Sequence, residues 1–206
     1  MTTDTMGKNA REISAPLPRD GAADDGQRID SKVEPEISLD VPLQAQALAK
    51  LSRREFSRYR RARTLLASGE GAAALLRKNI PLAGLGIFEA FLAQSWSIRF
   101  DSPDEMIRLA EVAVEVSRGL GGKIPSKRVA DLQARARGEL ANALRAADRL
   151  RSAQLAFGEA YTCLQRGTGD PYLKARLFDL EASLLGTLRE FPLALFRLSS
   201  LSNLYL

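Results

Sequence analysis

The chain has 206 residues, of which 45% are apolar and 27% charged, enough for one or two domains with a sizeable core. It contains no His and a single Cys, Cys163. This composition excludes His-based acid–base catalysis, Ser-His-Asp and Cys-His nucleophile sets, a Cys/His zinc site and an intramolecular disulfide. We therefore expect no enzyme and no cofactor, and we interpret Cys163 as a small packing residue.

Residues 1–41 differ in composition from the rest of the chain. They mix Gly, Pro, Ser, Asp and Glu without periodicity and carry nine acidic against five basic side chains, although the net charge of the chain is +5. Such a segment cannot bury enough apolar surface to offset the entropy of ordering. We predict a disordered acidic tail. The chain shows neither the apolar run of a signal peptide nor a window long enough to span a membrane, which indicates a cytoplasmic protein.

Residues 42–80 are expected to form a basic amphipathic helix, continuous to about Ser68, and a connector. One side of this helix is apolar, and the other carries the basic residues Lys50, Arg53, Arg54, Arg58, Arg60 and Arg61. Such a face contacts nucleic acid, an anionic membrane surface or an acidic partner. A solvated face on a helix that packs against the rest of the protein explains the same pattern.

Two further helices are predicted between residues 81 and 122. The first has a wide apolar face that includes Phe91 and Trp96, and this spacing is typical of core residues. The second begins at Ser102-Pro103-Asp104-Glu105, which combines a capping-box pattern with Pro at the first helical position. It ends at Gly119, Gly121 and Gly122. The Lys that follows these glycines does not make a phosphate-binding loop, because no strand precedes it.

From Ser126 to Leu206 one motif occurs twice. A shift of 41 residues aligns Ala141 with Ala182 and Ala153 with Ala194. In each copy a long helix, a turn and a second helix follow one another, with the first turn at Asp148–Arg149. Gly167 ends one helix, and Asp170 with Pro171 begins the next. A single hairpin cannot bury its apolar face, so the copies are expected to stack.

The first copy resembles the tetratricopeptide repeat (TPR) family, whose pattern is matched by Leu140, Ala141, Leu144, Ala153, Phe157 and Ala160. The second copy departs from it at Glu181, Leu198 and Leu201, and a weaker upstream copy matches at Met106, Ala110 and Ala113. The resemblance covers residues 81–206 and implies an all-α fold of about three helical hairpins, a TPR-like α-solenoid. The chain is also similar to bacterial repeat proteins that add such hairpins to a regulatory amino-terminal segment.

The resemblance implies a protein–protein interaction scaffold or adaptor. A partner segment would bind the concave surface lined by the first helix of each hairpin, and the family's groove positions fall on Asn142, Arg145 and Arg176. Gly138 and Leu180 occupy two positions where the family's carboxylate-binding members carry polar residues. The alternative is a regulator whose basic helix, residues 48–66, contacts nucleic acid or an anionic membrane through Arg53, Arg54, Arg58, Arg60 and Arg61.

The last predicted helix, residues 192–206, has more apolar residues than one contact face needs. They are Leu195, Leu198, Leu201, Leu204 and Leu206. Each repeat of a solenoid leaves one apolar side for the next repeat. We therefore expect this helix to self-associate, to bind a partner protein or to pack against a further repeat.

Overall fold

The computed structural model describes residues 40–70 and 83–202, and for 40–42, 69–70 and 201–202 only the backbone. These ranges contain helices and no strand, as expected for an all-α protein. The helices are α1 (Asp40–Ala49), α2 (Arg53–Leu65), the π-helical turn η1 (Leu66–Glu70), α4 (Leu85–Ser97), α5 (Pro103–Arg118), α6 (Ser126–Ala146), α7 (Leu150–Gln165), α8 (Pro171–Thr187) and α9 (Phe191–Ser202). The chain divides into two units, Met1–Glu36 and Ile37–Leu206, and every helix named here belongs to the second. The predicted tail (apart from the start of α1) and most of the connector before residue 81 lie outside the described residues.

The predicted continuous helix from residue 42 to 68 is wrong, because the chain forms two helices there. Ser52 has an extended backbone, with ψ of 160°, and its hydroxyl accepts a hydrogen bond from the Glu55 backbone N–H at 3.3 Å. Ser-Arg-Arg-Glu is a capping pattern, and it starts a new helix inside an apparently continuous amphipathic stretch. The chain does not end its helical structure at Ser68 either, since η1 carries it to Glu70.

Helix α4 supplies much of the hydrophobic core, as its apolar pattern predicted. Phe88 and Phe91 are fully buried and pack in one cluster with Leu109 and Val116 of α5. The Ser95 hydroxyl donates to the Met106 carbonyl at 3.0 Å and ties the two helices together. Helix α5 begins at Pro103 as predicted. Its capping box is absent, because the Ser102 side chain makes no cap hydrogen bond.

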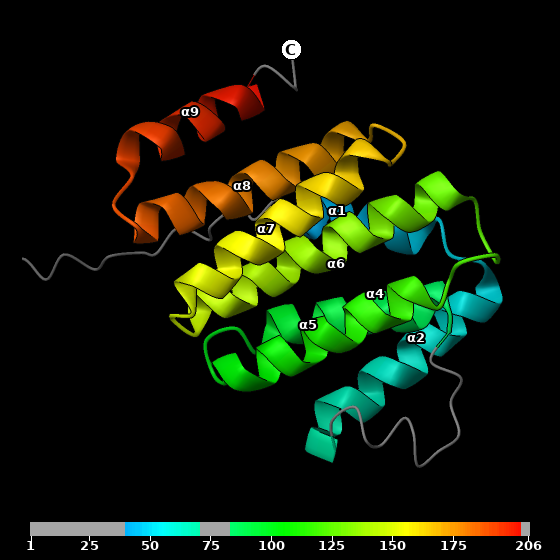
Figure 1. The fold of residues 1–206 in the computed structure, drawn as a ribbon. Coiled ribbons are helices and arrows are strands. Elements are labelled where there is room, and N and C mark those ends of the chain that lie inside the picture. The colour runs from blue at the N-terminus through cyan, green and yellow to red at the C-terminus, as the bar shows by residue number, and fades with distance from the viewer. Residues whose placement is uncertain (1–39, 71–82, 203–206) are drawn as a thin grey trace, which may run out of the picture. The chain divides into compact units, whose positions relative to one another are not determined.

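Helices α4 to α9 follow one another as three packed pairs, α4/α5, α6/α7 and α8/α9 (Figure 1). Helix α6 also packs against α5 and α8, so it is in contact with the pairs on both sides. Helix α9 contacts α8 and lies at the end of the row (Figure 1). The number of hairpins agrees with the expectation for residues 81–206, and their arrangement as a TPR-like solenoid stays a prediction.

The turns inside the second and third pairs have the same backbone geometry at the predicted offset of 41 residues. Asp148 and Arg189 both adopt the left-handed conformation, with φ of 58° and 61°. The closing hydrogen bonds are equivalent too: Arg149 N–H donates to the Leu144 carbonyl at 2.8 Å, and Glu190 N–H donates to the Leu185 carbonyl at 2.9 Å. This bond is characteristic of the Schellman motif at helix ends. The turn predicted at Asp148–Arg149 is therefore confirmed, and it occurs twice.

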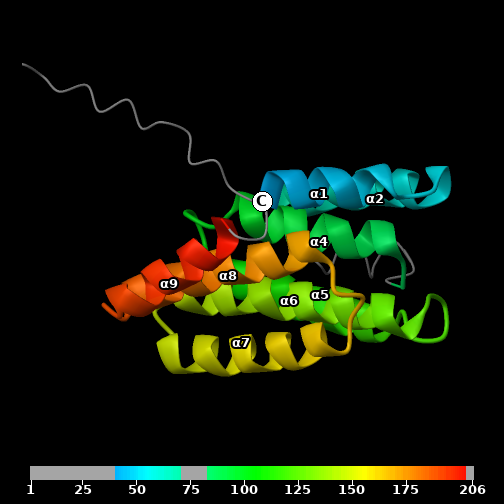
Figure 2. The same ribbon diagram turned by 90° about the horizontal axis from the view of Figure 1, so that it is seen from above.

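Helix α1 packs against α4 and α8. In Figure 2, α1 and α7 lie on opposite sides of α6 and α8. The first helices of the three pairs, α4, α6 and α8, thus form a face that carries a helix of the same chain. Leu43 is the buried side chain that α1 contributes to this contact.

Candidate functional site

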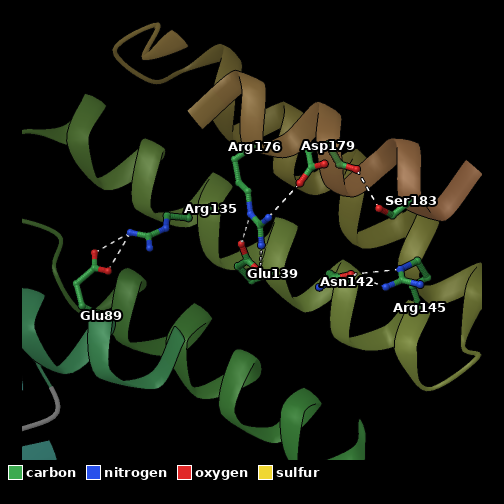
Figure 3. Close-up of polar contacts among 8 residues, drawn as sticks. All are labelled: Glu89, Arg135, Glu139, Asn142, Arg145, Arg176, Asp179 and Ser183. Atoms are coloured by element: carbon green, nitrogen blue, oxygen red, sulfur yellow. Dashed lines mark hydrogen bonds and ion pairs between the residues drawn. The ribbon is translucent and has the colours of Figure 1, made fainter. Parts of the chain in front are cut away.

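Arg176, one of the three predicted partner-binding residues, is buried in the structure. Its side chain is 1% exposed, and it donates from Nε and Nη2 to Glu139 of α6 at 2.9 and 3.2 Å. A third bond joins Nη1 to Asp179 at 3.1 Å (Figure 3). The guanidinium also lies 4.8 Å from the centre of the Trp96 ring. Arg176 therefore joins α4, α6 and α8 from the inside.

Asn142 and Arg145, the other two predicted groove residues, bind each other. The amide oxygen of Asn142 accepts from Arg145 Nε and Nη2 at 3.2 and 3.0 Å, and Asn142 is only 4% exposed (Figure 3). Gly138, one turn earlier, lies so close to α8 that a Cβ atom there would be 2.3 Å from Leu177 Cδ2. Helix α8 covers this part of α6, which leaves Asn142 and Arg176 no surface for a partner. We therefore do not build a partner site on this trio.

A second buried ion pair, Glu89–Arg135, joins α4 to α6. Arg135 Nη1 donates to both carboxylate oxygens of Glu89, at 2.8 and 3.0 Å (Figure 3). Burial raises the pKa of Glu89 above its ordinary value of 4.5, and the opposing effect of Arg135 does not cancel it. Sequence analysis missed this pair. The signal was present, because Glu89 is the single charge within an otherwise apolar stretch of α4.

The two ion pairs have a common origin in α6. Arg135 and Glu139 are four residues apart, a spacing that favours a bond within one helix. They pair outward instead, Arg135 with α4 and Glu139 with α8. Because a buried charge needs its partner, removing one member of either pair would leave an uncompensated charge between α6 and its neighbour.

A pocket of about 320 Å³ opens between α1, α4, α6 and α8. Most of its wall is apolar, and Glu89 and Arg135 both line it. Pockets of this size bind small molecules when a few polar groups converge on an apolar interior. This pocket was not expected from the sequence, because its walls come from four separate helices.

Four of the five arginines predicted for the basic face of α2 are exposed to solvent. Arg53, Arg54, Arg60 and Arg61 are exposed, and none of them pairs with an acid within the described residues. Arg58 differs, since it donates to Glu55 at 2.8 Å, and Glu55 in turn accepts from the Gly86 backbone N–H at 2.9 Å. Arg58 thus supports the contact between α2 and α4.

Helix α9 exposes an apolar surface. Its side chains Phe191, Leu193, Leu195, Phe196 and Leu198 are 43–63% exposed. The helix is held by Arg197, which pairs with Glu181 at 2.6 Å and lies 5.2 Å from the centre of the Phe178 ring. Tyr161 of α7 also donates to Glu181, at 2.5 Å. The apolar excess predicted for the last helix is confirmed for Leu195 and Leu198, while the side chains of Leu201, Leu204 and Leu206 lie outside the described residues.

Other chemistry is sparse in the described part of the chain. Cys163 is buried, in a cluster with Ala134, Ala160 and Leu173, as expected of a packing residue. No group of His, Cys, Asp and Glu with metal-binding geometry occurs among the described residues. Within the same ranges, no helix has the length and apolar character needed to cross a membrane.

Comparisons with protein-family models, with curated proteins and with solved structures return no match to this chain. The resemblance to the TPR family therefore rests on the residues of this chain alone.

Proposed function

We propose that the protein is an interaction scaffold that binds an amphipathic helix of a partner protein on the exposed face of α9. The observation that carries this proposal is the row of large apolar side chains on α9, more than half exposed in most cases. Contiguous apolar surface of this kind marks interaction sites in soluble proteins. Phe191, Leu195 and Leu198 follow the spacing of anchors for a helical partner.

The chain itself supports the choice of a helix as occupant. Leu150 and Phe157 of α7 stand at the positions that correspond to Phe191 and Leu198 of α9. In the α6/α7 pair they pack against Leu180 and Leu184 of α8. By analogy with α7, the exposed face of α9 should bind a helix that resembles α8, in which two leucines lie four residues apart. Arg197, the one charged residue of α9, is already paired with Glu181, so we expect recognition to be apolar.

A stapled peptide with the sequence of residues 171–187 tests this proposal directly. We expect it to bind the full chain saturably, as measured by fluorescence anisotropy. Leu195→Lys with Leu198→Lys should abolish binding, and a control peptide with Lys at the positions of Leu180 and Leu184 should not bind. Light scattering distinguishes the other occupant: a dimer that the same two substitutions dissolve assigns the surface to a second copy. A monomer that binds neither the peptide nor a hydrophobic dye contradicts the proposal.

A second candidate function rests on α2. Arg53, Arg60 and Arg61 line a shallow cavity together with Phe56, Ser57 and Thr64, so three arginines and two hydroxyl-bearing residues border the same space. This combination suits the phosphates of a nucleic acid or of an anionic membrane. Titration with duplex DNA, RNA and anionic vesicles over a range of salt tests it. Binding that falls steeply with salt and is lost in R53Q/R60Q/R61Q supports it, whereas binding indifferent to salt contradicts it.

A further inference from the structure

The pocket between α1, α4, α6 and α8 has an apolar lining from all four sides. Its apolar wall includes Leu43, Ala47 and Leu51 from α1 and its end, Leu85 of α4, Leu132 of α6 and Leu173 of α8. Side chains of this kind favour a hydrocarbon or aromatic body over a sugar or a nucleotide. The polar groups of the pocket determine which polar group the ligand carries.

The acidic groups of the pocket are already occupied by partners. Glu89 accepts both bonds from Arg135 Nη1. Asp131 accepts from the backbone N–H and the hydroxyl of Thr168, at 2.9 and 2.7 Å. Asp170 caps α8 by accepting from the backbone N–H groups of Tyr172 and Leu173. Each of these carboxylates therefore already has partners, although Asp170 accepts its two bonds through Oδ1 alone.

Beside the Gln46 amide, the hydrogen-bond donors that remain in the pocket belong to cations. Arg135 is 5% exposed, and its Nε–H is buried without an acceptor among the described residues. Its Nη2 also makes no hydrogen bond within the described residues, but unlike Nε this atom keeps some contact with solvent. At the rim, Lys50 and Arg128 are exposed and pair with no acid in the same part of the chain. A buried donor without an acceptor is costly, so a ligand that supplies an acceptor there gains affinity.

The geometry of Arg135 selects the kind of acceptor. The Nε and Nη2 atoms form one edge of the guanidinium, and this edge matches the two oxygens of a carboxylate. The Phe88 ring, with its centre 5.9 Å from the guanidinium carbon, lies against the same group. A doubly charged phosphate would add excess negative charge beside Glu89 in an apolar site, whereas a monoanion adds less.

We propose that this pocket binds a small apolar carboxylic acid, with its carboxylate on the Nε/Nη2 edge of Arg135 and its hydrocarbon against the leucines of α1, α4, α6 and α8. Lys50 and Arg128 attract the anion to the entrance. The site is separate from the exposed face of α9 and does not depend on partner binding there.

Octanoate and 1-octanol are the probes, because they share a hydrocarbon chain and differ in charge. We expect octanoate to bind the ¹⁵N-labelled full chain saturably and to shift the Nε–H resonance of Arg135, assigned by its loss in Arg135→Lys. Octanol should bind about tenfold more weakly, since it forms no charge-assisted pair. Equal affinity for the two probes, or no saturable binding at millimolar octanoate, overturns the proposal.

Variants locate the site without disturbing the buried ion pair. Lys50→Gln with Arg128→Gln changes only exposed rim residues and should weaken octanoate about threefold while leaving octanol unchanged. Lys127→Gln is the matched control, because Lys127 is exposed on the same helix and does not line the pocket. Ala47→Trp fills the pocket from α1 and should block both probes. Octanoate binding that survives Ala47→Trp, or that falls equally in Lys127→Gln, shows that the ligand binds elsewhere.

Discussion

The α6/α7 and α8/α9 pairs have equivalent turns, yet they bury their second helices very differently. Phe157 of α7 is 3% exposed, whereas Leu198, its counterpart in α9, is 43% exposed. The difference lies in the neighbours. Helix α8 packs against both α6 and α7. Within the described residues, α9 packs extensively against α8 alone. The same hairpin geometry therefore produces core in one pair and an exposed apolar surface in the other.

The joints between the pairs extend this comparison. Helix α6 is attached to both neighbours by buried ion pairs, Glu89–Arg135 and Glu139–Arg176. Helix α9 is attached by the Arg197–Glu181 pair, in which both side chains are partly exposed. Removing one partner of a buried pair is strongly destabilising, whereas exposed pairs contribute little. The contacts of α6 with its neighbours should therefore be more sensitive to loss of a charge than the contact of α9 with α8.

The largest expected effect comes from truncating the two equivalent side chains. Phe157→Ala should lower the free energy of unfolding by about 3–5 kcal/mol, because it leaves a cavity against Leu180 and Leu184. Leu198→Ala should cost less than about 1 kcal/mol, since Leu198 is already 43% exposed. Urea denaturation of both variants measures the difference. Equal losses would mean that α9 is covered in solution by another chain.

Breaking the joint between α6 and α8 should cost slightly less. Glu139→Ala removes the acceptor of two Arg176 hydrogen bonds. The Arg176 guanidinium then stays buried without the negative charge of Glu139. We expect a loss of about 3 kcal/mol. The control is Asp104→Ala, which breaks the exposed pair with Arg149 between α5 and α7 and should change stability by less than about 1 kcal/mol. If Glu139→Ala is as mild as this control, the buried pair does not hold the joint.

Sequence reasoning identified the features that depend on local chemistry. The helix starts at Pro103 and Pro171, the latter capped by Asp170, and the turn at Asp148 all follow from residues close together in the chain. The break at Ser52 was also signalled locally, by a capping pattern with Glu55. The apolar residues keep the same helical spacing on both sides of Ser52, so the hydrophobic pattern did not reveal the break.

The candidate site was beyond prediction for a physical reason. A charged residue such as Arg176 is normally exposed, and its partner Glu139 lies 37 residues away in the sequence. Only tertiary packing reveals that the two neutralise each other. The pocket beside Glu89 likewise requires α1 to lie across helices that are far from it in the chain. Neither relation leaves a periodic pattern in the sequence.

A smaller effect should distinguish the two turns. Arg189 and Asp148 both have positive φ, which strains a residue with a side chain, although Asp tolerates this conformation better than Arg. Arg189→Gly should raise stability by about 0.5 kcal/mol after the entropy of the unfolded chain is counted, and Asp148→Gly should raise it less. Thermal melting of the two variants measures the order. A loss of stability in Arg189→Gly would show that its side chain makes a contact worth more than the strain.

The smallest expected effect is a pH dependence at the joint between α4 and α6. Because burial raises the pKa of Glu89 above 4.5, the folded protein holds this proton more tightly than the unfolded chain does. The contribution of Glu89 to stability is therefore fully present below pH 4.5 and is lost as the pH rises through the raised pKa. Glu89→Gln removes this titration and adds a penalty, independent of pH, for leaving Arg135 without its carboxylate.

The stability of the wild type relative to Glu89→Gln should thus fall as the pH rises from about 4 to 8. Asp131, Asp170, Lys50 and Arg128 also line the pocket, but they are present in both proteins, so the comparison isolates Glu89. Urea midpoints at several pH values measure it. A difference that grows with pH would mean that Arg135 lowers the pKa of Glu89 more than burial raises it. In that case Glu89 is ionised over this whole pH range. Its negative charge then offsets the positive charge of Arg135, so Arg135 attracts a bound carboxylate less strongly.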